Sequence, residues 1–393
     1  MKKQKIAILG ATGSIGLNLI KILEKDKKKF DVVLLSANKN YKKLFDIAKK
    51  FKVKNIIISN PRTYKKLKKE NKNKKIRIFN NFNNLNKIIK KKIDYVMNSI
   101  VGIEGLEPTL KIIHLTKKIA IANKESIICG WSLIEKKLKK YNTNFIPVDS
   151  EHFSLWFGLK NVHINSIEKI YITASGGPFY KKPLKSFQNI KTKEALNHPS
   201  WKMGKKISID SATMINKVYE VIEAKNIFEI PYSKIKILIH PKSYIHAILK
   251  FNNGLIKLIA HETTMQIPIF NTLFDETNKK FKSKNLDVHK LNNLNLNNVD
   301  SNRYPVTKIL KLLENNHSLY ETVIVSTNDT LVDLFLRNKI KFTDINKYLI
   351  NLLIKKEFLK YKKIQPKNVR QIIELSKYVH LKVLEKVYKS INA

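Results

Sequence analysis

The stretch Ile6-Ala7-Ile8-Leu9-Gly10-Ala11-Thr12-Gly13-Ser14-Ile15-Gly16 decides the fold of this 393-residue chain. Its first four residues form an apolar run that predicts a buried strand, and residues 17–23 carry apolar residues at helical spacing. The three glycines between them let the backbone turn tightly, so that a pyrophosphate can approach the positive N-terminus of the helix. Glycine spacing alone also fits an ordinary tight turn, but its position between a first strand and a first helix favours dinucleotide binding.

Short apolar runs alternate with helix-like stretches through the first half of the chain. The candidate strands lie at residues 6–9, 32–36, 55–58, 95–98 and 119–122. Strands that alternate with helices predict a parallel sheet built by right-handed crossovers. We therefore expect an α/β protein whose residues 1–149 form a Rossmann-like, dinucleotide-binding domain with a parallel sheet.

The residue composition of the sequence changes after residue 149. Residues 150–274 place polar clusters between apolar strands, which predicts a central α/β catalytic domain. Residues 275–303 are rich in Asn and Lys and predict a linker. Residues 304–393 show helical periodicity and predict a C-terminal helical bundle.

The charge balance is extreme, with 76 Lys and Arg against 31 Asp and Glu and a formal net charge of +45. Such a charge suggests a non-enzymatic nucleic-acid-binding protein, which would bind any duplex in a salt-sensitive way. The excess is almost all lysine, spread along the chain, whereas arginine is the preferred base reader. We interpret it as a codon bias on tolerant surface positions and expect no nucleic-acid partner.

The end of the second predicted strand, Ser36-Ala37-Asn38-Lys39-Asn40, indicates which dinucleotide binds. NAD-preferring proteins usually place a carboxylate here, on the ribose 2′-hydroxyl. This segment has no carboxylate, and Lys39 would attract a 2′-phosphate. NADPH is therefore the expected cofactor, although Lys39 also fits the general excess of surface lysine.

Residues Asp149-Ser150-Glu151 place two carboxylates two positions apart, just after an apolar run. In an extended chain both point to the same side, where they can bind one hard cation. Glu220 or Glu223 could supply a third carboxylate, and oxygen ligands favour Mg²⁺ or Mn²⁺ over zinc. A solvated or capping acidic pair is the alternative.

Two hydroxyl-rich turns are predicted, at Ser175-Gly176-Gly177 and at Asp210–Thr213, and the second leads into a helix through Asn216-Lys217. Together they combine hydroxyls, backbone amides and a cation. These groups are the components of a phosphate monoester site. Serine at a helix start is also a common N-cap, which is the alternative for each segment.

The cysteine count and the lengths of the apolar runs restrict the cellular compartment and the chemistry that we expect for this protein. A single cysteine excludes an internal disulfide framework, and no run reaches the roughly 18 residues of a spanning helix. We expect a cytoplasmic protein with no membrane partner. A nucleophilic Cys129 would instead indicate a semialdehyde dehydrogenase, but a lone cysteine in an Ile-Ile-Cys-Gly run is typical of a core.

Taken in order, seven segments resemble the 1-deoxy-D-xylulose-5-phosphate reductoisomerase family. They are residues 10–16, 122–126, 147–152, 175–179, 198–204, 210–217 and 239–243. The resemblance covers essentially the whole chain. It implies the isomerisation of 1-deoxy-D-xylulose 5-phosphate and its reduction with NADPH to 2-C-methyl-D-erythritol 4-phosphate, a step of the non-mevalonate isoprenoid pathway. It also implies a homodimer formed through the central domain.

The resemblance further implies roles for individual residues. The cation, Mg²⁺ or Mn²⁺ with Co²⁺ as a further candidate, would be held by Asp149, Glu151 and Glu220, and Lys124 would complete the catalytic group. The substrate-binding residues would be Ser150, Glu151, Ser175, His198, Trp201, Ser211, Asn216, Lys217 and Glu220, of which Ser175, Ser211, Asn216 and Lys217 would bind the phosphate. The NADPH-binding residues would be Thr12, Gly13, Ser14, Ile15, Lys39, Asn40, Asn123, Glu125, Met203 and Gly204. His198, Trp201 and Met203 would belong to a mobile lid.

The chain departs from the family pattern at three places. Asn38 and Val218 stand where the family usually has glycine, which predicts a changed loop near the 2′-phosphate and a shifted substrate helix. Residues 153–156 are more aromatic than usual, which predicts repacking of the core.

Overall fold

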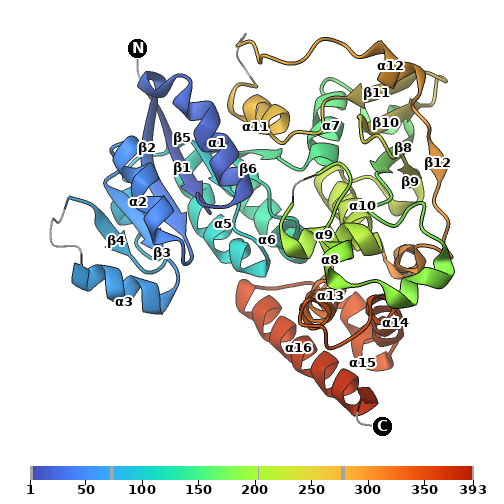
Figure 1. Ribbon diagram of the computed structural model, residues 1–393. Helices are drawn as coiled ribbons and strands as arrows, with labels where there is room; N and C mark the ends of the chain where they lie inside the picture. Colours follow the sequence, from blue (N-terminus) through green and yellow to red (C-terminus); the bar gives the residue numbers. More distant parts are fainter. Residues whose placement is uncertain (1–2, 71–74, 202, 276–278, 392–393) are drawn as a thin grey trace. The chain divides into compact units, whose positions relative to one another are not determined.

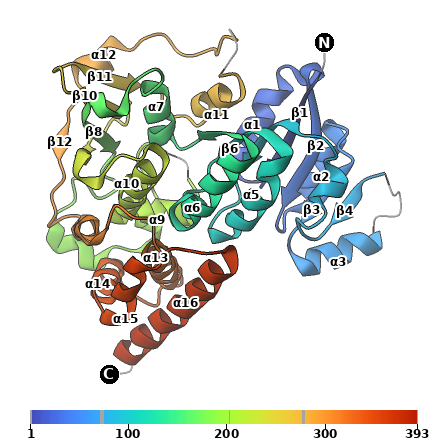
Figure 2. The same ribbon diagram turned by 180° about the vertical axis from the view of Figure 1, so that it is seen from behind.

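The computed structural model describes residues 3–70, 75–201, 203–275 and 279–391, which form two compact units (Figures 1 and 2). The first unit comprises Met1–Ser126, Ser132–Asp149 and Thr264–Lys282. The second comprises Ile127–Trp131, Ser150–Thr263 and Ser283–Ala393. These two units are groups of residues in contact, and each combines several stretches of the chain. The domain boundaries expected from the sequence stay a prediction.

A parallel sheet of strand order β4-β3-β2-β1-β5-β6-β7 forms the centre of the first unit, in the described residues. The strands are β1 (Gln4–Leu9), β2 (Phe30–Ala37), β3 (Asn55–Ile58), β4 (Arg77–Phe79), β5 (Ile93–Asn98), β6 (Thr116–Ile121) and β7 (Asn144–Pro147). The predicted α/β fold with a Rossmann-like parallel sheet is confirmed. Strands β4 and β7 were not predicted from the sequence, because each has only two or three apolar residues to mark it.

Helices cover both faces of this sheet, with α1 and α2 on one face and α5 and α6 on the other (Figures 1 and 2). The α-helices are α1 (Ser14–Glu24), α2 (Tyr41–Lys50), α3 (Pro61–Glu70), α4 (Leu85–Ile88), α5 (Leu106–Ile112), α6 (Lys124–Tyr141) and α11 (Gln266–Leu273). The 3₁₀ helices are η1 (Lys27–Lys29), η2 (Ile103–Gly105) and η3 (Ile113–Leu115).

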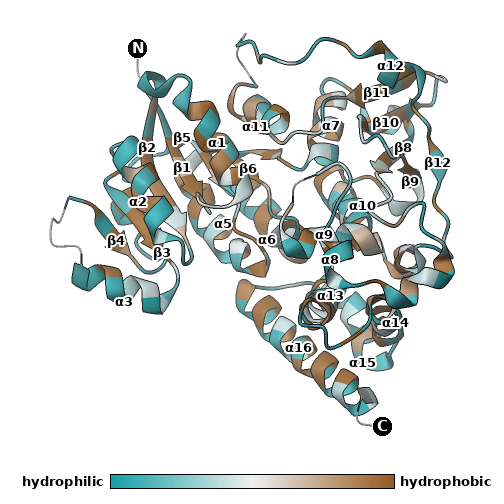
Figure 3. Ribbon diagram, viewed as in Figure 1, coloured by the Kyte–Doolittle hydropathy of each residue, from teal (hydrophilic) through white to brown (hydrophobic). Residues whose placement is uncertain are grey.

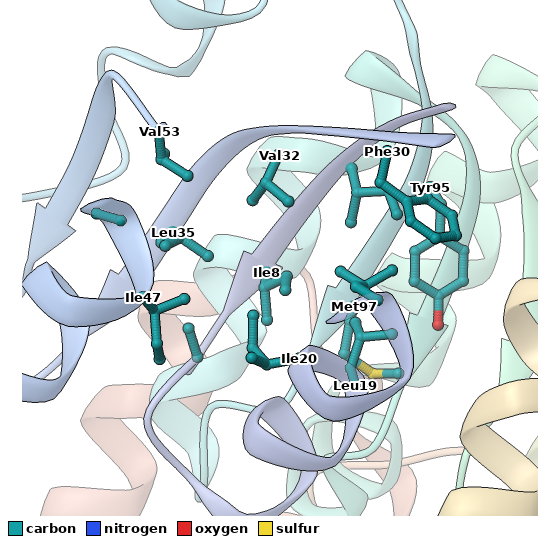
Figure 4. Packing of buried hydrophobic residues seen from close by; sticks show 14 of the residues in the cluster. Ile8, Leu19, Ile20, Phe30, Val32, Leu35, Ile47, Val53, Tyr95 and Met97 are labelled. Carbon is teal, nitrogen blue, oxygen red and sulfur yellow. The ribbon is translucent and has the colours of Figure 1, made fainter. Parts of the chain in front are cut away.

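The core of the first unit explains why β1 is apolar throughout. Ile6 and Ile8 have no exposed surface and share a cluster with Leu19 of α1 (Figure 4). Because alternate side chains of a strand point to opposite faces, the residues between them face α5 and α6, so both faces of the strand are buried. The hydroxyl of Tyr95 bonds to Thr272 of α11 at 2.8 Å, which satisfies a polar group within this core. The strands accordingly form the hydrophobic interior in Figure 3.

A mixed sheet of order β11-β10-β8-β9-β12 lies in the second unit, where only β8 and β9 pair in parallel among the described strands. The strands are β8 (Ile167–Ala174), β9 (Ile235–Ile239), β10 (Ile245–Phe251), β11 (Ile256–Ala260) and β12 (Asn297–Asn298). Leu155 and Val221 pack with Ile170 and Ile172 of β8. This cluster attaches α7 (Ser150–Gly158) and α10 (Ile215–Phe228), the two helices that carry candidate cation ligands, to one sheet.

The other elements of the second unit are mostly helical. They are α8 (Thr192–Ala195), α9 (Lys205–Thr213), α12 (Val288–Asn292), α13 (Tyr320–Leu336), α14 (Phe342–Leu353), α15 (Lys356–Leu359), α16 (Val369–Ile391), η4 (Ile164–Ser166), η5 (Leu184–Asn189), η6 (Tyr232–Lys234), η7 (Pro305–Leu312) and η8 (Lys360–Lys363). Part of the segment expected to be a linker therefore forms α12 and β12, and β12 pairs with β9. No helix in the described part of the chain is long and apolar enough to cross a membrane.

Candidate active site

Three carboxylates that the sequence predicted as cation ligands lie together. One oxygen atom each of Asp149, Glu151 and Glu220 lies within 4.8 Å of the other two. Asp149 follows β7, Glu151 is in the first turn of α7, and Glu220 is in α10. The predicted extended geometry of Asp149–Glu151 is wrong, because α7 begins at Ser150 and places its first turn there.

Two buried lysines neutralise these carboxylates. Nζ of Lys217 lies 2.8 Å from Oε1 of Glu151 and also bonds to Glu220, while Lys124 bonds to Asp149. Burial alone lowers the pKa of Lys217, but the neighbouring Glu151 and Glu220 raise that pKa above its ordinary value, so the ammonium stays charged. Clustered carboxylates that attract positive charge are the donor set of a hard divalent cation, so the residues fit the expected Mg²⁺ or Mn²⁺.

Glu220 is held at its side chain and at its backbone. Nδ2 of Asn216 donates to Oε1 of Glu220 at 2.5 Å, and Nε2 of His152 donates to the Glu220 carbonyl at 2.8 Å. Nδ1 of His152 lies 3.3 Å from Oε2 of Glu223, so the alternative third ligand faces this histidine instead. The contact joins the helices that carry Glu151 and Glu220. Sequence reasoning did not assign His152 a role, and its position next to Glu151 was the available signal.

The Ser175-Gly176-Gly177 turn follows β8 and lies against α9. Oγ of Ser175 accepts the Gly177 amide at 3.1 Å and lies 3.1 Å from Nε2 of His198. Gly177 has a φ of +68°, and a β-carbon there would lie 2.9 Å from the backbone oxygen of Ser211. Ser175, His198 and Ser211 are thus brought together. The predicted turn at Asp210–Thr213 is wrong, because these residues form the end of α9.

The hydrogen bonds of His198 define its tautomer. Nδ1 accepts the backbone amides of Ser200 at 3.1 Å and Trp201 at 3.0 Å. The proton of the neutral ring is therefore on Nε2, which donates to Oγ of Ser175. Burial lowers the pKa of His198 to about 4, so the ring stays neutral near pH 7. Oγ of Ser175 accepts two hydrogen bonds, which leaves its own proton for a further acceptor such as a phosphate oxygen.

The N-terminus of α10 presents two further predicted phosphate ligands. The helix begins after Met214, whose φ is +73°, and its first turn contains Asn216 and Lys217 but no acidic residue and no side-chain cap. A positive helix end without a nearby carboxylate in its first turn suits an anion. Val218 is fully buried inside this helix, so the valine is accommodated in a continuous Ile215–Phe228 helix.

The glycine-rich turn in the first unit has the geometry of a phosphate cradle. Gly10 has a φ of +80°, and a β-carbon there would lie 2.8 Å from the Ser99 backbone. A β-carbon on Gly16 would lie 2.6 Å from the Gly10 oxygen. Gly13 is exposed at the N-cap of α1, where it offers no side chain to cap the helix. Two glycines are therefore required by packing, and the third exposes the backbone, which fits a pyrophosphate. The neighbouring predicted ligands Thr12, Ser14 and Ile15 are exposed or half-buried on the same turn.

The end of β2 exposes Asn38, Lys39 and Asn40. Oδ1 of Asn40 accepts the Lys43 amide at 3.3 Å and caps α2. Asn38 is outside the left-handed region, so this backbone does not require the glycine that is usual in the family.

Asn123 and Glu125, both predicted to bind NADPH, are buried at the start of α6. Oδ1 of Asn123 accepts the Ser126 amide at 2.8 Å, and Nδ2 donates to the carbonyls of Gly102, at 2.6 Å, and Ile100. Asn123 therefore fixes the loop that follows β5. The cofactor roles of both residues stay predictions.

The predicted lid, which contains His198, Trp201 and Met203, forms no helix or strand in its described residues. Lys202 is not among the residues that the structure describes. The Trp201 ring lies 6.4 Å from that of His246 in an edge-on contact, and His246 stacks on His261 at 3.8 Å. Met203 and Gly204 follow directly and lead into α9.

Cys129 has no exposed surface and lies on α6. A buried thiol cannot attack a substrate, so the semialdehyde dehydrogenase alternative is rejected.

The cradle at the start of α1 and the carboxylates around α7 define a class, the NADP-dependent oxidoreductases. Three family models match the chain. They are 1-deoxy-D-xylulose 5-phosphate reductoisomerase over residues 6–130, its C-terminal domain over residues 145–228, and the DXP reductoisomerase C-terminal domain over residues 261–380. The chain belongs to the 1-deoxy-D-xylulose 5-phosphate reductoisomerase family.

Individual relatives agree over nearly the full length. The 1-deoxy-D-xylulose 5-phosphate reductoisomerase of Pelagibacter ubique is 58% identical over 382 residues, which cover 97% of this chain and 98% of the relative. A solved Zymomonas mobilis reductoisomerase in complex with NADPH is 30% identical, with a TM-score of 0.87 and coverage of 98% and 99%. A reductoisomerase solved with NADPH, fosmidomycin and magnesium is 30% identical, with a TM-score of 0.89 and 98% coverage of both chains. The predicted family, fold class and enzyme class are confirmed.

Proposed function

We propose that this chain isomerises 1-deoxy-D-xylulose 5-phosphate and reduces the branched aldehyde that results to 2-C-methyl-D-erythritol 4-phosphate in isoprenoid biosynthesis. When bound, NADPH would supply the hydride, and the cation would be Mg²⁺, with Mn²⁺ and Co²⁺ as alternatives. The observation that carries this proposal is the cluster formed by Asp149, Glu151 and Glu220 in a member of this family. A relative solved with NADPH, fosmidomycin and magnesium supports the choice of cofactors.

In this proposal Asp149, Glu151 and Glu220 hold the cation. When bound there, a divalent cation supplies polarisation of the ketone and of the adjacent hydroxyl oxygen. Lys124 bonds to Asp149 and is 8% exposed, so its ammonium stabilises negative charge and exchanges protons beside the reacting hydroxyls. Ser150 donates its hydroxyl proton to Glu151 and contacts the substrate.

The substrate phosphate binds Ser175, Ser211, Asn216 and Lys217. Two features support this assignment: the Ser175 hydroxyl has its proton available, and α10 begins without an acidic residue or side-chain cap. Neutral His198 fixes the Ser175 oxygen and closes with Trp201 and Met203 over the substrate, which excludes water.

NADPH binds the first unit through the cradle and the end of β2. The residues assigned to it in the first unit are Thr12, Gly13, Ser14, Ile15, Lys39, Asn40, Asn123 and Glu125, and Met203 and Gly204 of the second unit are also assigned to it. Exposed Lys39 meets the 2′-phosphate, and the Gly13 backbone meets the pyrophosphate.

We also propose the organisation that the sequence suggested. Residues 1–149 form the NADPH domain, 150–274 the catalytic domain, 275–303 a linker and 304–393 a helical domain. The protein is a cytoplasmic homodimer that pairs through the catalytic domain.

The test is NADPH oxidation by the purified chain with 1-deoxy-D-xylulose 5-phosphate, with Mg²⁺ or with a chelator. We expect turnover that needs the cation and prefers NADPH to NADH. Glu151→Gln should lower kcat by at least about 100-fold, because the cation loses a charged ligand. Glu168→Gln is the matched control, since Glu168 is a half-buried carboxylate that also pairs with a lysine, Lys250.

Turnover that persists with the chelator would contradict the proposed role of the cation. Equal rates for Glu151→Gln and Glu168→Gln would remove the ligand assignment. No turnover by the folded wild-type chain with Mg²⁺ would overturn the proposed reaction.

A further inference from the structure

Two consecutive residues before η7 hold the turn that follows β8. Tyr304 is buried, and its hydroxyl donates to the Gly176 carbonyl at 2.7 Å. Nη1 of Arg303 donates to the carbonyls of Phe179, at 2.8 Å, and Lys182, at 2.7 Å. We call Arg303 and Tyr304 the clasp. It lies more than 120 residues along the chain from the turn that it holds.

The Tyr304 contact controls the direction of one peptide plane. The Gly176 carbonyl and the Gly177 amide belong to the same planar, trans peptide group, so they point in opposite directions. Tyr304 holds the carbonyl end, and Oγ of Ser175 accepts from the amide end at 3.1 Å. The tyrosine hydroxyl therefore fixes the amide that orients the serine oxygen.

The turn needs such an external contact because of its composition. Gly176 and Gly177 have φ values of +83° and +68°, and neither has a side chain to restrict rotation of the peptide between them. A different peptide orientation would withdraw the Gly177 amide from Ser175.

We infer that Tyr304, supported by Arg303, is a positioning residue for the phosphate group of the substrate. This inference rests on the proposed function, because Ser175 is assigned there to phosphate. Tyr304 acts through the Gly176–Gly177 peptide rather than by contact with the substrate. Its loss should weaken phosphate binding and leave the chemistry at the carboxylates unchanged.

The variant Tyr304→Phe removes only the hydroxyl. The probe is inorganic phosphate, measured as a competitive inhibitor against 1-deoxy-D-xylulose 5-phosphate with the full-length enzyme, NADPH and Mg²⁺. We expect Ki for phosphate and KM for the substrate to rise together by about 3- to 10-fold, the range of one net hydrogen bond. The value of kcat should stay within about twofold and Kd for NADPH should not change, because neither depends on this peptide.

Tyr320→Phe is a matched control. Tyr320 is also buried in the second unit, and its hydroxyl donates to the Leu353 carbonyl at 2.9 Å. Both variants lose one buried hydroxyl-to-carbonyl bond, so similar decreases in thermal stability are expected. Only Tyr304→Phe should raise Ki for phosphate. Equal Ki values in the two variants would overturn the inference.

Ser175→Ala separates failure of this inference from failure of the proposed function. If Ser175→Ala leaves Ki for phosphate unchanged, the phosphate assignment is wrong. If it raises Ki while Tyr304→Phe does not, only the positioning role is wrong. Should Tyr304→Phe not fold, Arg303→Met removes the other half of the clasp and should raise Ki for phosphate in the same direction. An unchanged Ki there would also overturn the inference.

Discussion

Nζ of Lys217 lies 2.8 Å from Oε1 of Glu151, although Glu151 is also a proposed ligand of the divalent cation. The same ammonium bonds to Glu220, and the Lys217 side chain is only 6% exposed. One lysine therefore reduces the repulsion between the half-buried Glu151 and the buried Glu220. A cation that binds these oxygens has to compete with it.

Lys217→Met should make folding depend more strongly on the cation. Without Mg²⁺ we expect the free energy of unfolding to fall by about 3–5 kcal/mol, because Glu151 and Glu220 lose a buried partner. Mg²⁺ should bind more tightly than in the wild type and restore most of that loss. Urea unfolding over a Mg²⁺ titration measures both effects. Lys250→Met, at a half-buried lysine of the same unit that pairs with Glu168, is the control. Equal Mg²⁺ dependence in both variants would contradict the competition.

Much of the first unit follows from its sequence because its strands are buried on both faces. Such strands are continuous apolar runs, so β1, β2, β3, β5 and β6 stand out between helical stretches. The strand β12 lacked this signal, because Asn297 and Asn298 are polar and pair only at the edge of the second sheet. A polar edge strand cannot be distinguished from a loop by composition.

The candidate site was less predictable in its geometry than in its residues. Glu151 was predicted from two closely spaced carboxylates, yet the local helix that positions it was not. The contact of Tyr304 with Gly176 spans 128 residues and leaves no local pattern. Motifs carry the groups that meet a ligand, whereas the residues that orient them depend on tertiary contacts.

Gly13→Ala should separate cofactor binding from folding. A β-carbon on Gly13 would meet only the Gly10 oxygen, at 3.4 Å, so the free energy of unfolding should change by less than about 1 kcal/mol. The added methyl would occupy the exposed N-cap of the turn assigned to the pyrophosphate, so Kd for NADPH should rise at least about tenfold. Gly16→Ala should instead lower stability by about 1–3 kcal/mol, because its β-carbon would overlap backbone. NADPH titration by fluorescence and urea unfolding test the pair. An unchanged Kd for Gly13→Ala would reject the cradle.

Lys39→Ala should change the choice between the two dinucleotides. The side chain is exposed at the end of β2 and assigned to the 2′-phosphate. KM for NADPH should rise about three- to tenfold, as expected for one exposed charge-assisted contact, while KM for NADH stays constant. Lys42→Ala, at an exposed lysine on α2, should alter neither value. Parallel increases for NADPH and NADH would show that Lys39 does not recognise the 2′-phosphate.

Glu321 should make stability depend on pH. It is 1% exposed on α13, and burial raises its pKa from 4.5 to about 7, against hydrogen bonds from Ser318 that lower it. The folded state therefore holds a proton that the unfolded state loses between these values. Stability from Glu321 is fully present below pH about 4.5 and is lost as the pH rises through about 7. The difference is roughly 3 kcal/mol for a pKa change of this size.

The measurement is urea unfolding of wild type and Glu321→Gln from pH 4.5 to 8. Other groups titrate in both proteins, so the difference between the two curves isolates Glu321. Because glutamine cannot ionise, the variant should gain stability relative to wild type as the pH rises. Ser318→Ala removes the hydroxyl that donates to Oε2 of Glu321 at 2.6 Å and keeps the backbone amide that donates to it at 3.1 Å. Because the lost hydrogen bond lowers the pKa of Glu321, the pH at which this stability is lost should rise in Ser318→Ala. Parallel curves for wild type and Glu321→Gln would mean that Glu321 does not change its protonation on folding.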